Sequence, residues 1–127
     1  MIYKNYTPHD IVLFKKSGKF YYNSQTKNYY LKEKFRSELK YEWKSLGIAR
    51  CESNRESIPS PDGIPWIKLN KPTIYNLPDP EEGVLYIVSM KVARAAKELG
   101  RTDCVAPSKR VRDRYGNRLG CLGFIFV

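Results

Sequence analysis

Apolar residues occur in short runs along this chain, and most of the runs have the length and composition of strands. β-Forming residues fill 10–14 and recur at 19–22 after a Lys-Lys-Ser-Gly turn, which predicts a β-hairpin. Shorter strands are predicted at 48–51 and 66–69. The segment between these two contains three prolines and a glycine at 57–65, so we expect a turn-rich connection there.

The period of the apolar residues changes between residues 29 and 46. Leu31, Phe35, Leu39 and Leu46, with Trp43 beside them, recur at spacings close to multiples of four. This stripe predicts an amphipathic helix at about 31–46, which Gly47 ends.

A strand, a turn and a helix are predicted next to one another at 84–100. Residues 84–88 form an apolar run, Ser89 is a favourable N-cap, and residues 90–99 contain helix formers with an apolar side before Gly100. Residues 109–121 predict a second hairpin around Tyr115-Gly116-Asn117. We therefore expect a single compact α+β domain over 1–127, with a mostly antiparallel sheet and two helices at about 31–46 and 90–99.

Composition narrows the class of protein. The chain of 127 residues carries a net charge of +10, divided evenly between its halves, and 42% hydrophobic residues exclude a wholly disordered chain. No apolar run has the roughly 18 residues of a membrane-spanning helix, and the N-terminal residues lack the apolar block of a signal peptide. We expect a soluble protein of the cytoplasm.

Cysteine and histidine give few candidates for chemistry. Cys51, Cys104 and Cys121 are widely spaced without a CxxC pair, which favours reduced, packed thiols. One histidine, His9, makes a zinc site improbable, and we expect no metal and no cofactor. His9 and Asp10 form the one pair that resembles acid–base machinery, although a structural role is the simpler interpretation.

The hairpin at 109–121 is the main candidate for binding. In a strand, Arg110, Arg112 and Arg114 share one face, and arginine suits two-point contact with phosphate. The alternative is a solvated edge strand whose charge prevents aggregation. Tyr115 in the turn is a candidate for stacking on a base.

Two further features favour anions or nucleic acid. The predicted helix start at Ser89 and Lys91 offers free amides and the positive end of a helix dipole, although an ordinary capped helix explains it equally. Seven of the ten tyrosines precede residue 42, and interleaved Lys and Tyr at about 19–46 suit either single-stranded nucleic acid or a half-buried interface.

Several motifs resemble a group of small, largely uncharacterised proteins encoded by phages and prophages. They are Thr7-Pro8-His9-Asp10-Ile11, Asp62-Gly63-Ile64-Pro65, the run from Leu77-Pro78-Asp79-Pro80 to Ser89, and Val111-Arg112-Asp113 followed by Gly116-Asn117. The basic, Tyr-rich segment at about 19–46 departs from this group as an insert. The resemblance implies an anti-defence protein, some of which sequester cyclic or NAD-derived signalling nucleotides.

These observations lead to a functional hypothesis with two alternatives. The hypothesis is a non-enzymatic, homo-oligomeric binder of a small phosphorylated nucleotide in the host bacterial cytoplasm. Arg110, Arg112 and Arg114 would hold phosphates, helped by the helix start at Ser89 and Lys91. Tyr86 or Tyr115 would stack on a base, and His9 would form a hydrogen bond with the ligand. The first alternative is a protein that binds nucleic acid or an acidic host protein, and the second is an enzyme that cleaves a nucleotide signal.

Overall fold

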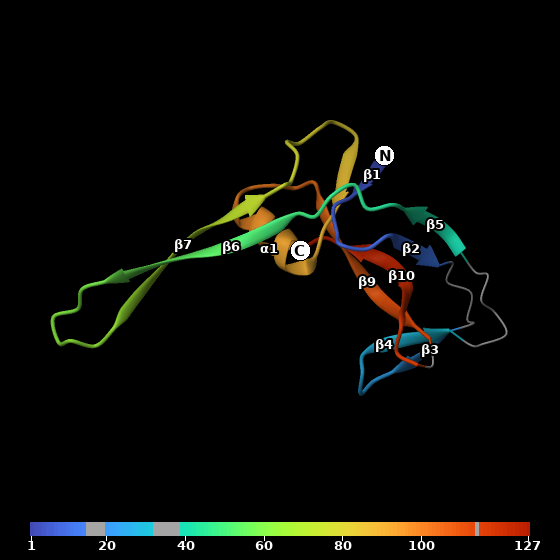
Figure 1. The fold of residues 1–127 in the computed structure, drawn as a ribbon, viewed down its shortest axis with the longest axis horizontal. Coiled ribbons are helices and arrows are strands. Elements are labelled where there is room, and N and C mark those ends of the chain that lie inside the picture. The colour runs from blue at the N-terminus through green and yellow to red at the C-terminus, as the bar shows by residue number, and fades with distance from the viewer. Residues whose placement is uncertain (15–19, 32–38, 114) are drawn as a thin grey trace.

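A computed structural model describes residues 1–14, 20–31, 39–113 and 115–127 of the chain (Figure 1). Within these ranges the fold is dominated by strands, with one short helix. The elements in chain order are β1 (Ile2–Asn5), β2 (Ile11–Phe14), β3 (Phe20–Asn23), β4 (Asn28–Leu31), β5 (Leu39–Trp43), β6 (Arg50–Ile58), β7 (Trp66–Tyr75), β8 (Val84–Ile87), α1 (Met90–Glu98), β9 (Cys104–Arg112) and β10 (Arg118–Ile125). No helix among them is long and apolar enough to cross a membrane.

Six strands of the larger sheet form a path that nearly closes on itself. The order is β1-β8-β9-β10-β2-β5, and a parallel bridge between Asn5 and Ser45 joins its two ends. The side chain of Asn5 is buried at this seam and donates to the carbonyls of His9 (2.8 Å) and Trp43 (3.0 Å). A buried amide whose donors are both satisfied fixes one geometry for the closure.

The sheet is mixed rather than mostly antiparallel. The β1–β8, β8–β9, β10–β2 and β4–β9 pairs are parallel, whereas β9–β10, β2–β5 and β3–β4 are antiparallel. The parallel pairs follow from the β8-α1-β9 crossover and from long returns of the chain, which residue-by-residue patterns do not reveal.

The predicted helix at 31–46 is wrong where the structure describes it. Residues 28–31 and 39–43 are strands, and residues 32–38 lie outside the described part of the chain. Tyr41 and Trp43 lie two residues apart with ring centroids 5.6 Å from each other, so the period of the aromatic residues here is two. β5 pairs with β2 through Trp43 opposite Ile11.

The predicted hairpin at 10–22 is also wrong in its pairing. β2 pairs with β5 and β10, whereas β3 pairs with β4. The turn after β3 is organised by Asn23, whose side-chain oxygen accepts from the amides of Gln25 (2.9 Å) and Thr26 (3.2 Å). The predicted turn at 15–18 lies outside the described residues.

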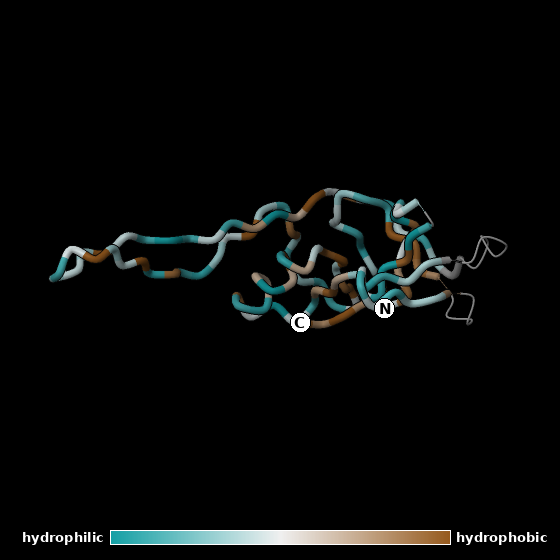
Figure 2. The backbone as a smooth tube through the Cα atoms, turned by 90° about the horizontal axis from the view of Figure 1, so that it is seen from below, coloured by the Kyte–Doolittle hydropathy of each residue, from teal (hydrophilic) through white to brown (hydrophobic). Residues whose placement is uncertain are grey.

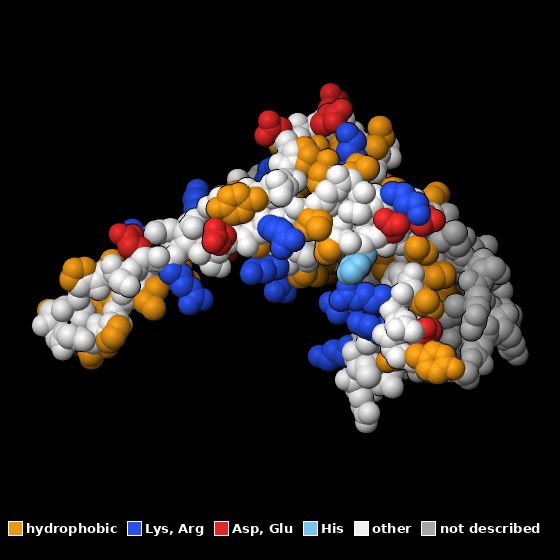
Figure 3. Space-filling model, viewed as in Figure 1, with side chains coloured by type: hydrophobic (Ala, Val, Ile, Leu, Met, Phe, Trp, Pro, Cys, Tyr) orange, Lys and Arg blue, Asp and Glu red, His pale blue; other side chains and the backbone are white. Residues whose placement is uncertain are grey.

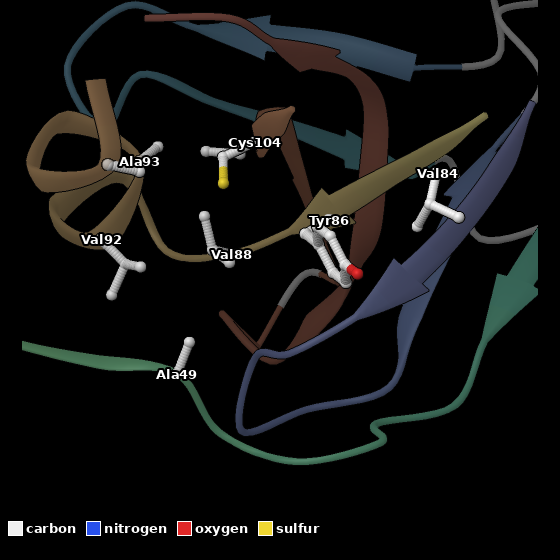
Figure 4. Packing of buried hydrophobic residues seen from close by; sticks show 9 residues of the cluster. Ala49, Val84, Tyr86, Val88, Val92, Ala93 and Cys104 are labelled. Atoms are coloured by element: carbon white, nitrogen blue, oxygen red, sulfur yellow. The ribbon is translucent and has the colours of Figure 1, made fainter. Parts of the chain in front are cut away.

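The strand, turn and helix predicted at 84–100 are confirmed. Ser89 is the N-cap of α1 and its hydroxyl accepts from the amide of Val92 at 3.2 Å, while Gly100 follows the helix with a φ of 83°. One side of α1 packs into the main core, where Figure 4 shows Val92 and Ala93 beside Val88 and Cys104.

β6 and β7 form a separate two-stranded ribbon that extends well beyond the rest of the molecule (Figures 1 and 2). Cys51 and Ile74 at its base pack against the main core. The outer half exposes large apolar side chains, among them Ile64, Trp66, Ile67 and Leu69. An isolated two-stranded ribbon is only marginally stable in water, so this half is anchored through its base.

Candidate functional site

The β9–β10 hairpin is built around the carboxylate of Asp113. Its oxygens accept from the amides of Tyr115 and Asn117, both at 2.9 Å, and from the side-chain amide of Asn117 at 3.0 Å. Gly116 takes a φ of 83°, a conformation that glycine adopts without strain. The predicted hairpin and its turn are therefore confirmed, and the negative charge of Asp113 faces the turn amides.

Two strands flank the arginine end of β9, one on each side. On one edge β4 pairs with β9, with Tyr30 opposite Arg112, and β3 continues this edge with Tyr21 opposite Tyr30. On the other edge Arg118 of β10 lies opposite Arg112. Because directly opposite residues point to the same side of a sheet, these side chains form one line across four strands. We call Tyr21, Tyr30, Arg112 and Arg118 the Tyr–Arg row.

The aromatic half of the row is already ordered by stacking. The rings of Tyr21 and Tyr30 are stacked with centroids 5.3 Å apart and an angle of 18° between their planes. The hydroxyl of Tyr30 is 3.1 Å from that of Thr26. Tyr21 remains 48% exposed, so its ring presents an accessible aromatic surface.

The reverse side of the same strands is core. Tyr29 and Val111 lie opposite each other, and Val111 packs with Phe14 in a second hydrophobic cluster that includes Tyr29. Since strands alternate their side chains, burial of this face forces the Tyr–Arg row to the other face.

Arg112 is held in position but keeps free donors. Its Nη1 donates to the carbonyl of Gly116 at 2.7 Å, which ties the guanidinium to the turn. Its Nε is buried without a hydrogen-bond partner. Arg118 is exposed, and neither arginine forms an ion pair with another described residue. Two guanidiniums opposite each other repel, and an anion between them removes that repulsion.

The other residues predicted for the hairpin are placed as follows. Arg110 is exposed on β9, two residues before Arg112, and Tyr115 is exposed in the turn. Arg114 lies outside the described residues. Arg118 was not among the residues predicted to share the arginine face, yet a one-residue bulge between Arg118 and Gly120 brings it opposite Arg112.

The helix start lies away from the row. β8 reaches β9 only as far as Val105, and Arg112 is seven residues further along β9, about 23 Å of strand. Ser89 is an exposed N-cap, and Lys91 lines a groove between α1 and the β6–β7 ribbon. The residues predicted to bind phosphate therefore lie in two separate places, the turn end of the β9–β10 hairpin and the start of α1.

Tyr86 is a core residue rather than a surface for stacking. It is 1% exposed, its hydroxyl donates to the carbonyl of Asp79 at 3.0 Å, and the guanidinium of Arg101 lies 5.8 Å from its ring centre. Burial raises the pKa of the Tyr86 hydroxyl. With both its ring and its hydroxyl occupied, Tyr86 has no surface left for a ligand base.

His9 and Asp10 have different surroundings. His9 is exposed, and its main-chain carbonyl accepts from Asn5 and from Thr7, both at 2.8 Å. The Asp10 carboxylate accepts from the amide of Ser45 at 2.9 Å and contacts Lys44 at 3.3 Å. The hydrogen bond from the Ser45 amide and the contact with Lys44 lower the pKa of the Asp10 carboxylate. Asp10 thus anchors the segment after β5, a structural role.

The cysteines are free thiols, and two of them are buried. Burial raises the pKa of Cys104 to about 12 and that of Cys121 to about 11, so both are protonated and unreactive at neutral pH. Within the described ranges no group of His, Cys, Asp and Glu side chains has the arrangement of a metal site.

Comparisons with protein-family models, with curated proteins and with solved structures find no match for this chain.

Proposed function

We propose that the protein binds a small phosphorylated nucleotide on the Tyr–Arg row. The observation that carries the proposal is the register that aligns Tyr21 and Tyr30 with Arg112 and Arg118 across four strands. A nucleotide offers an aromatic base and a phosphate, and the row offers an aromatic surface at one end and guanidiniums at the other.

The dimensions of the row favour a ligand larger than a mononucleotide. Three strand spacings of about 4.8 Å separate Tyr21 from Arg118, so the row is about 14 Å long. A cyclic dinucleotide or an ADP-ribose derivative has a base and phosphates far enough apart to contact both ends. Arg112 offers a charge-assisted hydrogen bond to a phosphate through the donors that Gly116 does not occupy, and its bond to Gly116 reduces the entropy lost on binding.

The proposed activity is sequestration rather than turnover. Holding a signal requires complementary contacts and slow release, and neither depends on a general base or a nucleophile. A sponge for a host immune nucleotide is the role that the resemblance to phage proteins implies, and the row has the chemistry that such a sponge needs.

A second candidate is a single strand of nucleic acid laid across the same row. Lys and Arg side chains lie on both sides of the hollow between the β6–β7 ribbon and the β3–β4 end of the molecule (Figure 3). Stacked aromatics combined with distributed positive charge bind single strands with little sequence preference. The net charge of +10 favours this partner as well.

Thermal unfolding in the presence of a ligand panel tests the proposal. Cyclic dinucleotides, ADP-ribose derivatives and short oligonucleotides are compared, and oligonucleotide binding is repeated at increasing salt. A shift specific to one small nucleotide supports sequestration, whereas steeply salt-dependent binding of oligonucleotides alone supports the second candidate. Recovery of the nucleotide in chemically altered form would contradict both candidates and indicate an enzyme that cleaves the nucleotide.

A further inference from the structure

A groove of about 640 Å³ lies between α1 and the base of the β6–β7 ribbon, away from the Tyr–Arg row. Its volume is in the range of small-molecule sites in proteins. Leu69 and Pro72 of β7 and Met90 and Ala95 of α1 contribute apolar surface. The remaining lining is polar or charged, and most of the charge is positive.

A β-bulge brings Lys71 to this groove. Asn54 lies opposite Asn70 and Glu52 lies opposite Thr73, so one residue of β6 faces the two residues Lys71 and Pro72 of β7. A bulge redirects the side chain of the extra residue, and proline is tolerated there because its missing amide is not needed for pairing. Lys71 consequently lines the groove together with residues of α1.

Asn54 holds the bulge in shape. Its side-chain amide donates to the carbonyl of Lys71 at 2.8 Å and to the hydroxyl of Thr73 at 2.9 Å, one contact within the bulge and one just after it. Asn54 also lines the groove. The backbone that positions Lys71 is therefore fixed before any ligand arrives.

Three cations meet in the groove without anionic partners. Lys71 comes from β7, and Lys91 and Arg94 come from the first two turns of α1. None of them forms an ion pair with a described residue. Glu98 is the one acidic residue of the lining, and although Arg94 precedes it by four residues, the usual helical ion pair is not formed.

Concentrating like charges in a concave surface is unfavourable unless an anion neutralises them. The first turn of α1 adds the positive end of the helix dipole and contains no acidic residue. We infer that this groove is a second binding site, specific for a phosphorylated small molecule whose anionic part contacts Lys71, Lys91 and Arg94 and whose apolar part lies on Met90 and Leu69. The inference does not rest on the function proposed for the Tyr–Arg row.

Pyrophosphate is a suitable probe because it presents the anionic part alone. Titration into the ¹⁵N-labelled full chain should shift the backbone amides of β7 and α1 around Lys71 and Lys91. Replacing both lysines, Lys71→Ala with Lys91→Ala, should weaken pyrophosphate binding at this site at least tenfold, as measured from the concentration dependence of these shifts.

The matched control takes one lysine from each of the same two elements, Lys68→Ala with Lys97→Ala, neither of which lines the groove. It should leave the affinity at the groove within twofold, and so should Arg112→Ala with Arg118→Ala, which separates this site from the row. The inference is overturned if pyrophosphate causes no shifts at β7 and α1, or if the control pair weakens binding as much as the groove pair.

Discussion

Arg112 and Arg118 lie directly opposite each other on β9 and β10, at the turn end of the hairpin. Like charges in this position destabilise a strand pair, so the hairpin carries a repulsion that an anionic ligand would relieve. The Asp113 carboxylate next to them accepts hydrogen bonds from the turn amides. This relationship connects the local structure of the hairpin to the function proposed for it.

Tyr21 and Tyr22 provide a matched pair for the aromatic half of the row. They are adjacent and similarly exposed, at 48% and 53%, but alternate to opposite faces of β3. We predict that Tyr21→Ala weakens nucleotide binding about tenfold, the effect of removing one stacking contact of 1–3 kcal/mol. Tyr22→Ala should leave the affinity unchanged. Equal losses in both variants would argue against stacking on the row.

Gly120 is a point of close approach between β10 and β2. A Cβ there would lie 2.3 Å from the carbonyl oxygen of Val12 and 2.8 Å from the ring of Phe14. Gly120→Ala should therefore lower the free energy of unfolding by at least about 2 kcal/mol. Gly123→Ala is the control, since its Cβ meets nothing within 4 Å and its expected change is about 0.5 kcal/mol or less. Urea unfolding of the two variants decides the comparison.

Arg101 and Asp103 form a mostly buried ion pair, with Nε and Nη2 each 2.9 Å from a carboxylate oxygen. Burial alone raises the pKa of Asp103, but the hydrogen bonds and charge of Arg101 outweigh it and bring the pKa below 3.8. The unfolded chain then binds the extra proton, so this pair stabilises the fold above about pH 4 and the contribution disappears as the pH falls through the lowered pKa.

Asp103→Asn removes this pH dependence and is expected to lower the free energy of unfolding by about 2 kcal/mol at pH 7. Unfolding free energies measured between pH 2 and 7 should converge for the wild type and the variant at the acid end. A constant difference at every pH would show that the ion pair does not provide the stabilisation.

Homo-oligomerisation stays a prediction, and the outer half of the β6–β7 ribbon is the surface on which to test it. Ile64 and Ile67 are 58% and 59% exposed, whereas residues 50–75 carry four basic and three acidic side chains in an otherwise strongly basic chain. Because the ribbon is nearly neutral, the electrostatic repulsion between two positively charged copies is lowest when they associate through it. Ile64→Ser with Ile67→Ser should reduce the mass measured by sedimentation.

Ile2→Ser is the control for that pair, because Ile2 is 60% exposed on β1 in the body of the protein. It should leave the measured mass unchanged. A wild-type protein that sediments as a monomer at high concentration would make the prediction of a homo-oligomer wrong.

Local signals in the sequence were sufficient for α1 and for the β9–β10 hairpin. Ser89 and Gly100 mark the helix ends through side-chain and backbone preferences that need no distant partner. Gly116 and Asn117 mark the turn in the same way. The pairing of strands could not be predicted from local signals. β5 forms by pairing with β2, which is distant in the sequence, and Tyr41 and Trp43 of β5 also fit part of a helical stripe.

The sequence indicated that the candidate sites bind anions, but it did not indicate all of the residues that form them. Alternation along β9 indicated a shared face for Arg110 and Arg112, whereas the addition of Tyr21 and Tyr30 depends on the pairing of β4 with β9, between residues 82 positions apart in the sequence. Lys71 joins the groove through a bulge, which shifts the register by one residue without a sequence signal beyond Pro72. Tyr86 was predicted to stack on a ligand base because the sequence does not show that the folded protein buries its ring beneath Arg101.

Calorimetric titration of the wild type and the Arg112→Ala/Arg118→Ala variant with a cyclic dinucleotide and with ADP-ribose tests nucleotide binding on the Tyr–Arg row most directly. We predict that the wild type binds at least one of them, and that the variant binds about 100-fold more weakly, from the loss of two charge-assisted contacts of at least about 1.5 kcal/mol each. Its melting temperature without ligand should equal or exceed that of the wild type, because removing the opposed charges relieves repulsion. Absence of binding by the wild type, or unchanged affinity in a folded variant, would contradict the proposed function.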